Sequence, residues 1–305
     1  MRFFFPATLL ALALLPPSTA ATLTPAASGW SPPRIAALMT EARLTETSGI
    51  AAASRPGHWW VINDSGHAAE LHLMDGRGKR SASFGIEGVG NTDWEDLAAF
   101  EWNGRRHLLI ADTGDNGGIR ETLELIVVAE PARLRDGDRL PVAWRLRFRW
   151  PDGARDCEAV AVDAARGEIL LISKKRVPPE LFRLPLRPPG NELLVAERVG
   201  LLAGIAQPNA EDLARNPVYG RFRSQISAAD LSPDGRTLAV LNYRAAYLYI
   251  RSADGDWSVA LQRPERLDFP WMPQAEAIAF ARDGRSLWVA GEQTPSPLIR
   301  FDRRP

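Results

Sequence analysis

Residues Asn91–Asn116, NTDWEDLAAFEWNGRRHLLIADTGDN, contain the pattern that recurs along the rest of the chain. Two apolar runs of strand length, Leu97–Phe100 and His107–Ala111, flank a polar turn at Asn103-Gly104, which is the signature of a β-hairpin. Acidic residues precede the first run and follow the second. Because the ends of antiparallel strands lie side by side, we expect these carboxylates to meet at one rim.

The same unit occurs five times, and its copies begin at Ser48, Glu95, Glu158, Ser227 and Glu276. In each copy a short apolar run is followed by a glycine and then by a second apolar run. The spacings between starts are 47, 63, 69 and 49 residues, and the shorter two match the roughly 40 to 50 residues of a propeller blade. The sequence therefore predicts an all-β fold, a β-propeller with five blades, and six blades are the alternative.

The remaining strands and the closure of the ring follow from the same pattern. Third and fourth strands are expected at Leu123–Ala129 with Val142–Trp150, and at Ala246–Ile250 with Trp257–Leu261. The polar insertion 203–224 is too short for another blade. The last unit ends after Leu298–Phe301, one strand short, so we expect the N-terminal stretch Ile35–Glu41 to complete it and close the ring without free edges.

The first 20 residues have the pattern of a secretory signal peptide, with Arg2, an apolar run through Leu15 and small residues up to Ala20. The apolar run is shorter than the roughly 20 residues that a transmembrane helix needs. We therefore expect no membrane span and a periplasmic or secreted protein. Residues 21–33 are interpreted as a leader or linker, and residues 34–305 as a single propeller domain.

Composition and motifs exclude several classes of function. The chain has 37 basic and 37 acidic residues, a balance that gives no reason to expect a nucleic-acid partner. Cys157 is the single cysteine, so no intrachain disulfide can form. The four histidines lack zinc-ligand spacing, and the chain has no G-x-S-x-G, Walker or Rossmann fingerprint.

The candidate site follows from the propeller geometry, in which the first strand of each blade lines the central channel. The equivalent first-strand positions are Glu95, Glu158 and Glu276, with Ser48 and Ser227 in the other two blades. Further acids are expected at the same rim, namely Glu46, Asp64, Asp93, Asp96, Asp112, Asp156 and Glu292. Like charges at short range raise one another's pKa, so the cluster needs a counter-charge or a proton.

Three arrangements satisfy that requirement. One is a hard cation with oxygen ligands, for which we expect Ca²⁺ and the ligands Glu95, Asp96, Glu158, Glu276 and Asp112. Another is a metal-free pair of carboxylates that performs acid and base catalysis. In the third, each acid caps a strand end or pairs with a neighbouring basic residue and has no further role.

The segments SGIAAASRPGHWWVINDSG, DWEDLAAF, IADTGDNGGIR, DCEAVAVD, DLSPDG and QAEAIAF touch every predicted blade. In these segments the chain resembles a family of secreted bacterial β-propeller proteins of mostly unassigned function. In fold and acidic channel it is also loosely similar to the calcium-dependent propeller hydrolases, namely the phytase-like, gluconolactonase and paraoxonase groups. That second resemblance implies hydrolysis of a phosphate ester, an ester or a lactone, but it is an analogy of fold.

The leading hypothesis is an exported, metal-dependent propeller hydrolase. In it Glu158 and Glu276 belong to the catalytic centre, and Lys175 and Arg120 orient a small anionic substrate. One alternative is a non-catalytic binding or scaffold module of the envelope, which would dock a peptide or a glycan and show exposed aromatic side chains. Another is a metal-free glycosidase that uses two carboxylates from neighbouring blades.

Overall fold

The structure, a computed structural model, describes residues 29–252 and 255–304. The predicted signal peptide and the first part of the predicted leader lie outside the described residues. The last part of that leader pairs with the C-terminal residues of the chain. Trp30 forms a β-bridge with Arg303 and is buried, and the Ser31 amide donates to the Asp302 carbonyl at 2.7 Å.

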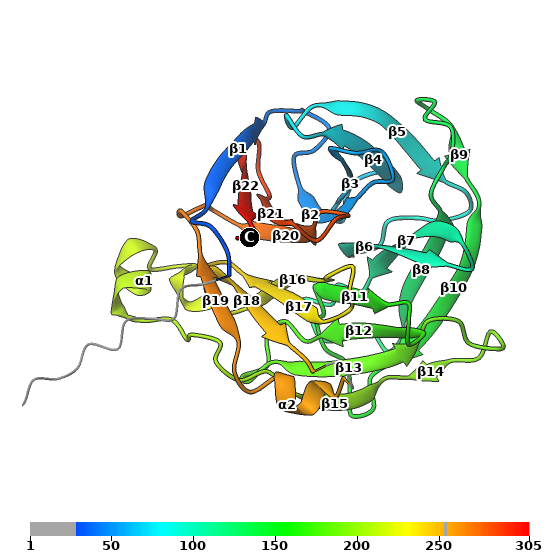
Figure 1. Cartoon of the computed structure of the whole chain (residues 1–305). Helices are drawn as coiled ribbons and strands as arrows, with labels where there is room; N and C mark the ends of the chain where they lie inside the picture. The colour runs from blue at the N-terminus through cyan, green and yellow to red at the C-terminus, as the bar shows by residue number, and fades with distance from the viewer. Residues whose placement is uncertain (1–28, 253–254, 305) are drawn as a thin grey trace, which may run out of the picture.

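Five β-sheets are arranged in a ring (Figure 1). The first contains β2 (Thr47–Ala52), β3 (His58–Asn63), β4 (Glu70–Asp75), β5 (Arg80–Ile86) and a short outer β9 (Arg139–Leu140). The second contains β6 (Trp94–Trp102), β7 (Arg105–Asp112), β8 (Leu123–Ala129), β10 (Val142–Arg149) and a short outer β14 (Leu194–Val195). The third contains β11 (Ala159–Asp163), β12 (Glu168–Ile172), β13 (Glu180–Pro185) and β15 (Glu197–Leu201). The fourth contains β16 (Ile226–Leu231), β17 (Thr237–Asn242), β18 (Ala245–Ile250) and β19 (Glu265–Asp268).

The fifth sheet closes the ring as the sequence predicts. It contains β20 (Ala275–Phe280), β21 (Ser286–Gly291), β22 (Ser296–Asp302) and, as its outer strand, the N-terminal β1 (Arg34–Met39). β1 pairs antiparallel with β22, from Arg34 opposite Arg300 to Met39 opposite Ser296. The predictions of five blades and of closure by an N-terminal strand are therefore confirmed.

The hydrophobic core lies between neighbouring blades. The innermost strands β2, β6, β11, β16 and β20 each contact the next one around the ring, and β20 contacts β2. Each of the buried apolar clusters combines residues of two adjacent sheets. Aromatic pairs join the blades, for example Trp59 with Trp288 at 5.0 Å and Trp150 with Phe182 at 4.9 Å between ring centroids. Strands buried on both faces explain the nearly continuous apolar runs of the sequence.

Two segments outside the sheets are short helices. The predicted strand Trp257–Leu261 is wrong, because Trp257–Ala260 forms helix α2, and β19 supplies the fourth strand of its blade. Asp256 caps α2 by accepting a hydrogen bond from the Ser258 amide at 2.8 Å, which favours a helical turn.

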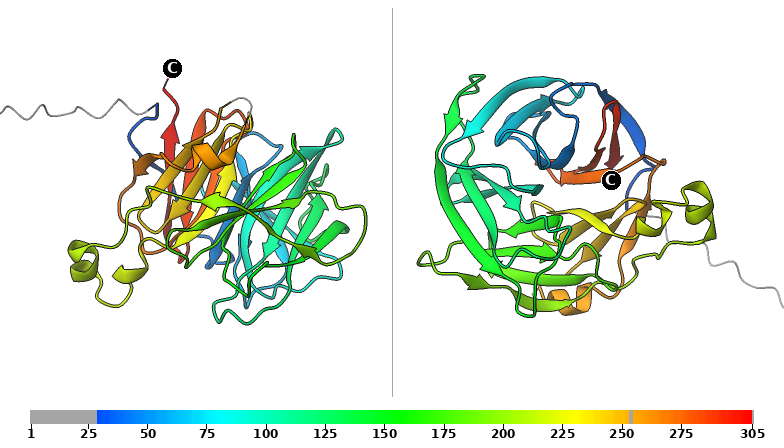
Figure 2. Two further views of the ribbon diagram at one scale, coloured as in Figure 1. Left: turned by 90° about the horizontal axis from the view of Figure 1, so that it is seen from below. Right: turned by 180° about the vertical axis from the view of Figure 1, so that it is seen from behind.

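The insertion 203–224 contains helix α1 (Ala210–Arg215) and the 3₁₀ turn η1 (Gly220–Phe222), and α1 projects from the edge of the ring (Figure 2). Its lack of strands agrees with the expectation that it forms no sixth blade. Among the described residues, no helix is long and apolar enough to cross a membrane.

Candidate functional site at the channel mouth

Each innermost strand is irregular at the position that the repeat aligns. The pairing register shifts by one residue at Ser48, Glu95, Ser227 and Glu276, and β11 begins directly after Glu158. A β-bulge leaves one extra residue unpaired and redirects its side chain. The five aligned residues therefore lie at one end of the ring, which we call the channel mouth.

A second aligned set follows the neighbouring strands. Its members are Asp64, Thr113, Lys174, Tyr243 and Glu292. The amides of Asp64, Lys174 and Glu292 donate to the carbonyls of Glu46, Asp156 and Gln274, each two residues before the bulge. Tyr243 and Thr113 hold the same place by register, since Asn242 and Asp112 pair with the residues before the bulges.

The hydroxyl groups at the mouth join adjacent blades. The Ser48 Oγ donates to the carbonyl of Trp94 at 2.8 Å, and the Ser227 Oγ donates to that of Ala275 at 2.6 Å. The Thr113 Oγ1 donates to the carbonyl of Cys157 at 2.7 Å. In each case the acceptor is the residue before the bulge of the next blade. These hydroxyls therefore hold blades together.

Seven carboxylates form what we call the acidic mouth: Asp64, Asp93, Glu95, Asp156, Glu158, Glu276 and Glu292. Glu95 belongs to two triads in which one oxygen of each acid lies within 4.8 Å of the others. One triad adds Asp64 and Asp93, and the other adds Asp156 and Glu158. Oxygens on opposite sides of a Ca²⁺ ion lie about 4.6 to 5.2 Å apart, so each triad has the span of a calcium site.

The basic residues of the mouth compensate only part of this charge. Lys174 pairs with Glu158, and the Lys175 Nζ lies 2.9 Å from the Asp156 Oδ2. Within the described chain, Asp64, Asp93, Glu95, Glu276 and Glu292 have no ion pair. The Glu158 side chain is 5% exposed, and its Oε2 has no hydrogen-bond partner. Buried carboxylate oxygens are normally hydrogen-bonded, so this atom is available to bind a cation or a hydrogen-bond donor.

The protonation of these acids reflects the missing counter-charge. Burial raises the pKa of Glu276 to about 8, and repulsion from Glu292 adds to the rise. Burial and repulsion from Asp64 raise the pKa of Glu292 to about 7. The pKa of Glu95 is raised well above its ordinary value by burial and then by Asp64. Without a cation, protons partly neutralise the mouth at neutral pH.

Tyr243, the residue that follows β17, contacts this cluster. Its side chain is hydrogen-bonded to Glu276, and burial raises the pKa of the Tyr243 phenol far above its ordinary value. Tyr243 is therefore a neutral partner of Glu276. Residue type did not point to Tyr243, because charged side chains, Asp64, Lys174 and Glu292, occupy the equivalent position in three other blades.

The loop after β7 approaches the acids most closely at Gly114. A Cβ on Gly114 would collide with the carboxylates of Glu95 and Asp93. Arg120 holds this loop by donating to the Gly114 carbonyl and to the Asp112 Oδ1, both at 2.7 Å. The glycine of the DTGDN segment thus leaves room for one of the two triads.

Among the residues predicted from sequence, Asp112, Arg120 and Asp96 belong neither to the triads nor to the acidic mouth. Asp112 and Arg120 pair with each other. Asp96 is fully buried, and its carboxylate accepts hydrogen bonds from the amides of Leu97 at 2.8 Å, Val160 at 2.8 Å and Ala229 at 3.1 Å. It thereby joins the innermost strands of three blades inside the channel.

The other predicted residues meet at the mouth. Glu95 and Glu158 are triad members, and Glu276 belongs to the same cluster beside Tyr243 and Glu292. Lys175 also donates to the side-chain and backbone oxygens of Asn116, each at 2.9 Å, and so joins two mouth loops.

No family model matches the sequence. No curated protein matches it in sequence either. A gluconolactonase from Xanthomonas campestris has a similar fold, with 11% identity, a TM-score of 0.45, and coverage of 84% of this chain and 71% of that chain. A luciferin-regenerating enzyme is similar at 10% identity and a TM-score of 0.45, covering 87% of this chain and 94% of that one. Neither similarity carries an argument about activity.

Proposed function

We propose that the acidic mouth binds a divalent cation, with Ca²⁺ as the expected ion. Glu95 supplies a ligand from the centre of the site, because both triads share it. Asp64 and Asp93 supply negative charge that no basic residue of the described chain pairs with. The observation that carries this proposal is the pair of oxygen triads around Glu95, beside the unsatisfied Oε2 of Glu158.

A bound cation would polarise the oxygen of a phosphate ester, an ester or a lactone, and we propose hydrolysis of such a substrate. Glu276 can serve as the general acid or base, because its pKa of about 8 lets it carry a proton at neutral pH and release it. Tyr243 orients this carboxyl through their hydrogen bond. Lys175 is 38% exposed and can contact the anionic part of a substrate.

The test is a hydrolysis screen of phosphomonoesters, aryl esters and lactones, each with added calcium and with EDTA. We expect turnover of one class that requires calcium and is lost in Glu158→Gln. Glu101→Gln changes an exposed acid of β6 and should keep full activity. Turnover that survives EDTA, or that persists in Glu158→Gln, would contradict the proposal.

A second candidate is a non-catalytic binding module. Trp271 is 55% exposed and Tyr219 is 65% exposed. Tyr219 lies in the segment that precedes β16, and Trp271 lies in the segment that precedes β20, so both are on the side of the mouth. Aromatic side chains on that side suit a glycan or a peptide. Calcium binding without turnover in any ester class, together with glycan binding that Trp271→Ala abolishes, would favour this function.

Export is also a proposal, and it rests on the N-terminal sequence alone. We propose that residues 1–20 direct the protein to the periplasm or the medium. Mass spectrometry of the mature protein would test it, and an N-terminus near Ala21 is the expected result. A retained Met1 on the protein recovered from the cytoplasm would contradict it.

A further inference from the structure

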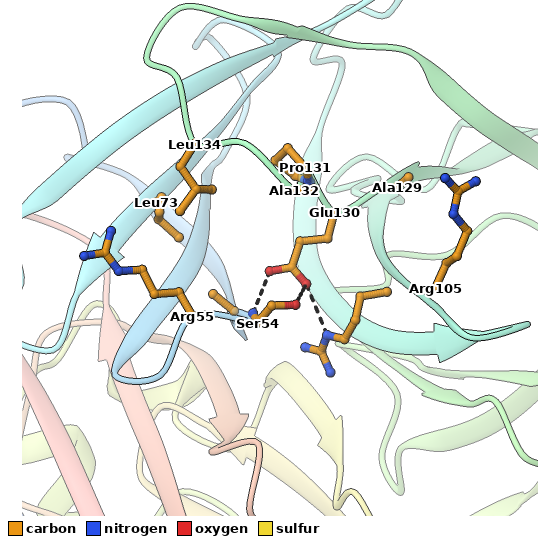
Figure 3. Close-up of a pocket in the computed structure, with 11 residues that line it drawn as sticks. Ser54, Arg55, Leu73, Arg105, Ala129, Glu130, Pro131, Ala132 and Leu134 are labelled. Carbon is orange, nitrogen blue, oxygen red and sulfur yellow. Dashed lines mark hydrogen bonds and ion pairs between the residues drawn. The ribbon is translucent and has the colours of Figure 1, made fainter.

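A cavity of about 600 Å³ lies at the end of the ring opposite the mouth, between the first and second blades (Figure 3). β2 and β6 both begin at the mouth, and the cavity is lined by the turns that follow them and by the segment after β8. Its volume falls within the 300 to 1,000 Å³ that is typical of small-molecule sites. We call it the far pocket.

The floor of the far pocket is built around Glu130, whose side chain is 5% exposed. Its Oε1 accepts hydrogen bonds from the Ser54 amide at 2.6 Å and the Trp60 Nε1 at 2.9 Å. Its Oε2 accepts from the Ser54 Oγ at 2.7 Å and the Arg106 Nε at 3.1 Å. These partners lower the pKa of Glu130 despite its burial. The carboxylate is therefore ionised and already satisfied, and it fixes the two blades to each other.

Two further arginines give the far pocket its net positive charge. Arg55 and Arg105 are exposed, and in the described part of the chain neither guanidinium has an ion pair or a hydrogen bond. Figure 3 shows them on opposite sides of the pocket, with Ser54 and Glu130 between them. Because Arg106 neutralises Glu130, the charges of Arg55 and Arg105 remain uncompensated.

Part of the pocket wall is apolar, on the side of Arg55 (Figure 3). Leu73 is buried, Leu134 is 38% exposed, and both line the pocket together with Pro131. A ligand that fits this arrangement needs an aliphatic body for the wall and an anionic group for each guanidinium. Guanidinium groups bind carboxylates through paired hydrogen bonds, so the carboxylate is the matching group.

We propose that the far pocket binds a small organic diacid with an aliphatic body and a carboxylate at each end. Arg55 binds one carboxylate, Arg105 binds the other, and Leu73 and Leu134 contact the chain between them. The site is distinct from the acidic mouth and does not depend on its function.

Calorimetric titration with linear diacids, from adipate through azelate to sebacate, tests this proposal on the purified wild-type protein. We expect saturable binding of one or more of them, and weaker binding of the monoacid nonanoate. Arg55→Gln and Arg105→Gln should each weaken diacid binding about tenfold, which is about 1.4 kcal/mol. Arg77→Gln, an exposed arginine outside the pocket, should leave it unchanged.

Two further measurements make the result decisive. Leu134→Ser should weaken the longer diacids more than adipate, because it removes the apolar contact. The urea-unfolding midpoint of the double variant, Arg55→Gln with Arg105→Gln, should equal that of the wild type, which would show that the fold is intact. The proposal is overturned if the double variant binds diacids as the wild type does, or if the wild type binds none of them at millimolar concentration.

Discussion

Raising the pH from about 6.5 to about 8.5 without calcium should destabilise the folded protein by about 2 kcal/mol. The folded-state pKa of Glu276 is about 8, above its ordinary value of 4.5. Between those values the folded state holds a proton that the unfolded chain has released, so the free energy of unfolding falls as the pH rises. The loss is complete once the pH has passed through about 8.

The magnitude follows from one proton with a pKa of about 8. Integrating its release over this pH window gives about 2 kcal/mol. A destabilisation of that size lowers the Tm by about 4 to 8 °C in a domain of this class. Burial also raises the pKa of Glu292 and of Asp230 to about 7, so both acids add to this loss and about 2 kcal/mol is its lower bound. The window begins near 6.5 because burial lowers the pKa of His72 to about 4, so this histidine contributes only at lower pH.

Urea unfolding at each pH, with EDTA and then with calcium, measures the effect. Calcium should flatten the pH dependence, since a bound cation replaces the protons. Glu276→Gln should lose about half of the dependence, because Glu292 and Asp230 still titrate in the window, and it should be at least as stable as the wild type near pH 8.5 without calcium. The exposed Glu101→Gln should keep it. A wild-type stability that is constant or rises across the window would refute the reasoning.

Substitutions at three positions test other parts of the account. Asp96→Ala should cost about 3 to 5 kcal/mol in urea unfolding, because it leaves the buried amides of Val160 and Ala229 without an acceptor. Asp96→Asn keeps one acceptor oxygen and should cost less, and equal costs would argue against this role. Gly114→Ala should abolish the calcium-induced rise in Tm, because its Cβ would occupy the space of two acidic-mouth carboxylates, and an unchanged rise would exclude that geometry. Lys174→Met should tighten calcium binding about tenfold in calorimetry, since it removes a competing positive charge, and weaker binding would show that the lysine supports the site.

The repeat predicts the fold because its signals are local. Each blade begins with Ser or Glu, followed by an apolar run and a glycine turn, and these predict the first two strands without tertiary information. A strand was wrongly predicted at Trp257–Leu261, because a short apolar run is compatible with either a strand or a helix. The Asp256 side chain caps the N-terminus of α2 and thereby stabilises the helix.

The site was harder to predict because adjacent residues of a strand point in opposite directions. Glu95 and Asp96 are neighbours in sequence, yet Glu95 joins the acidic mouth and Asp96 binds backbone amides inside the channel. Tyr243 could be found only from the register of β17 against β16, which places it in line with Asp64 and Glu292. Residue type alone does not reveal such a partner.

Calorimetric titration of calcium into the wild-type protein and into Glu95→Gln tests the central claim most directly, because Glu95 belongs to both triads. We predict saturable binding to the wild type, unchanged binding to Glu101→Gln, and at least about tenfold weaker binding to Glu95→Gln. Absence of saturable binding to the wild type at millimolar calcium, or equal binding to Glu95→Gln, would contradict a cation site at the channel mouth.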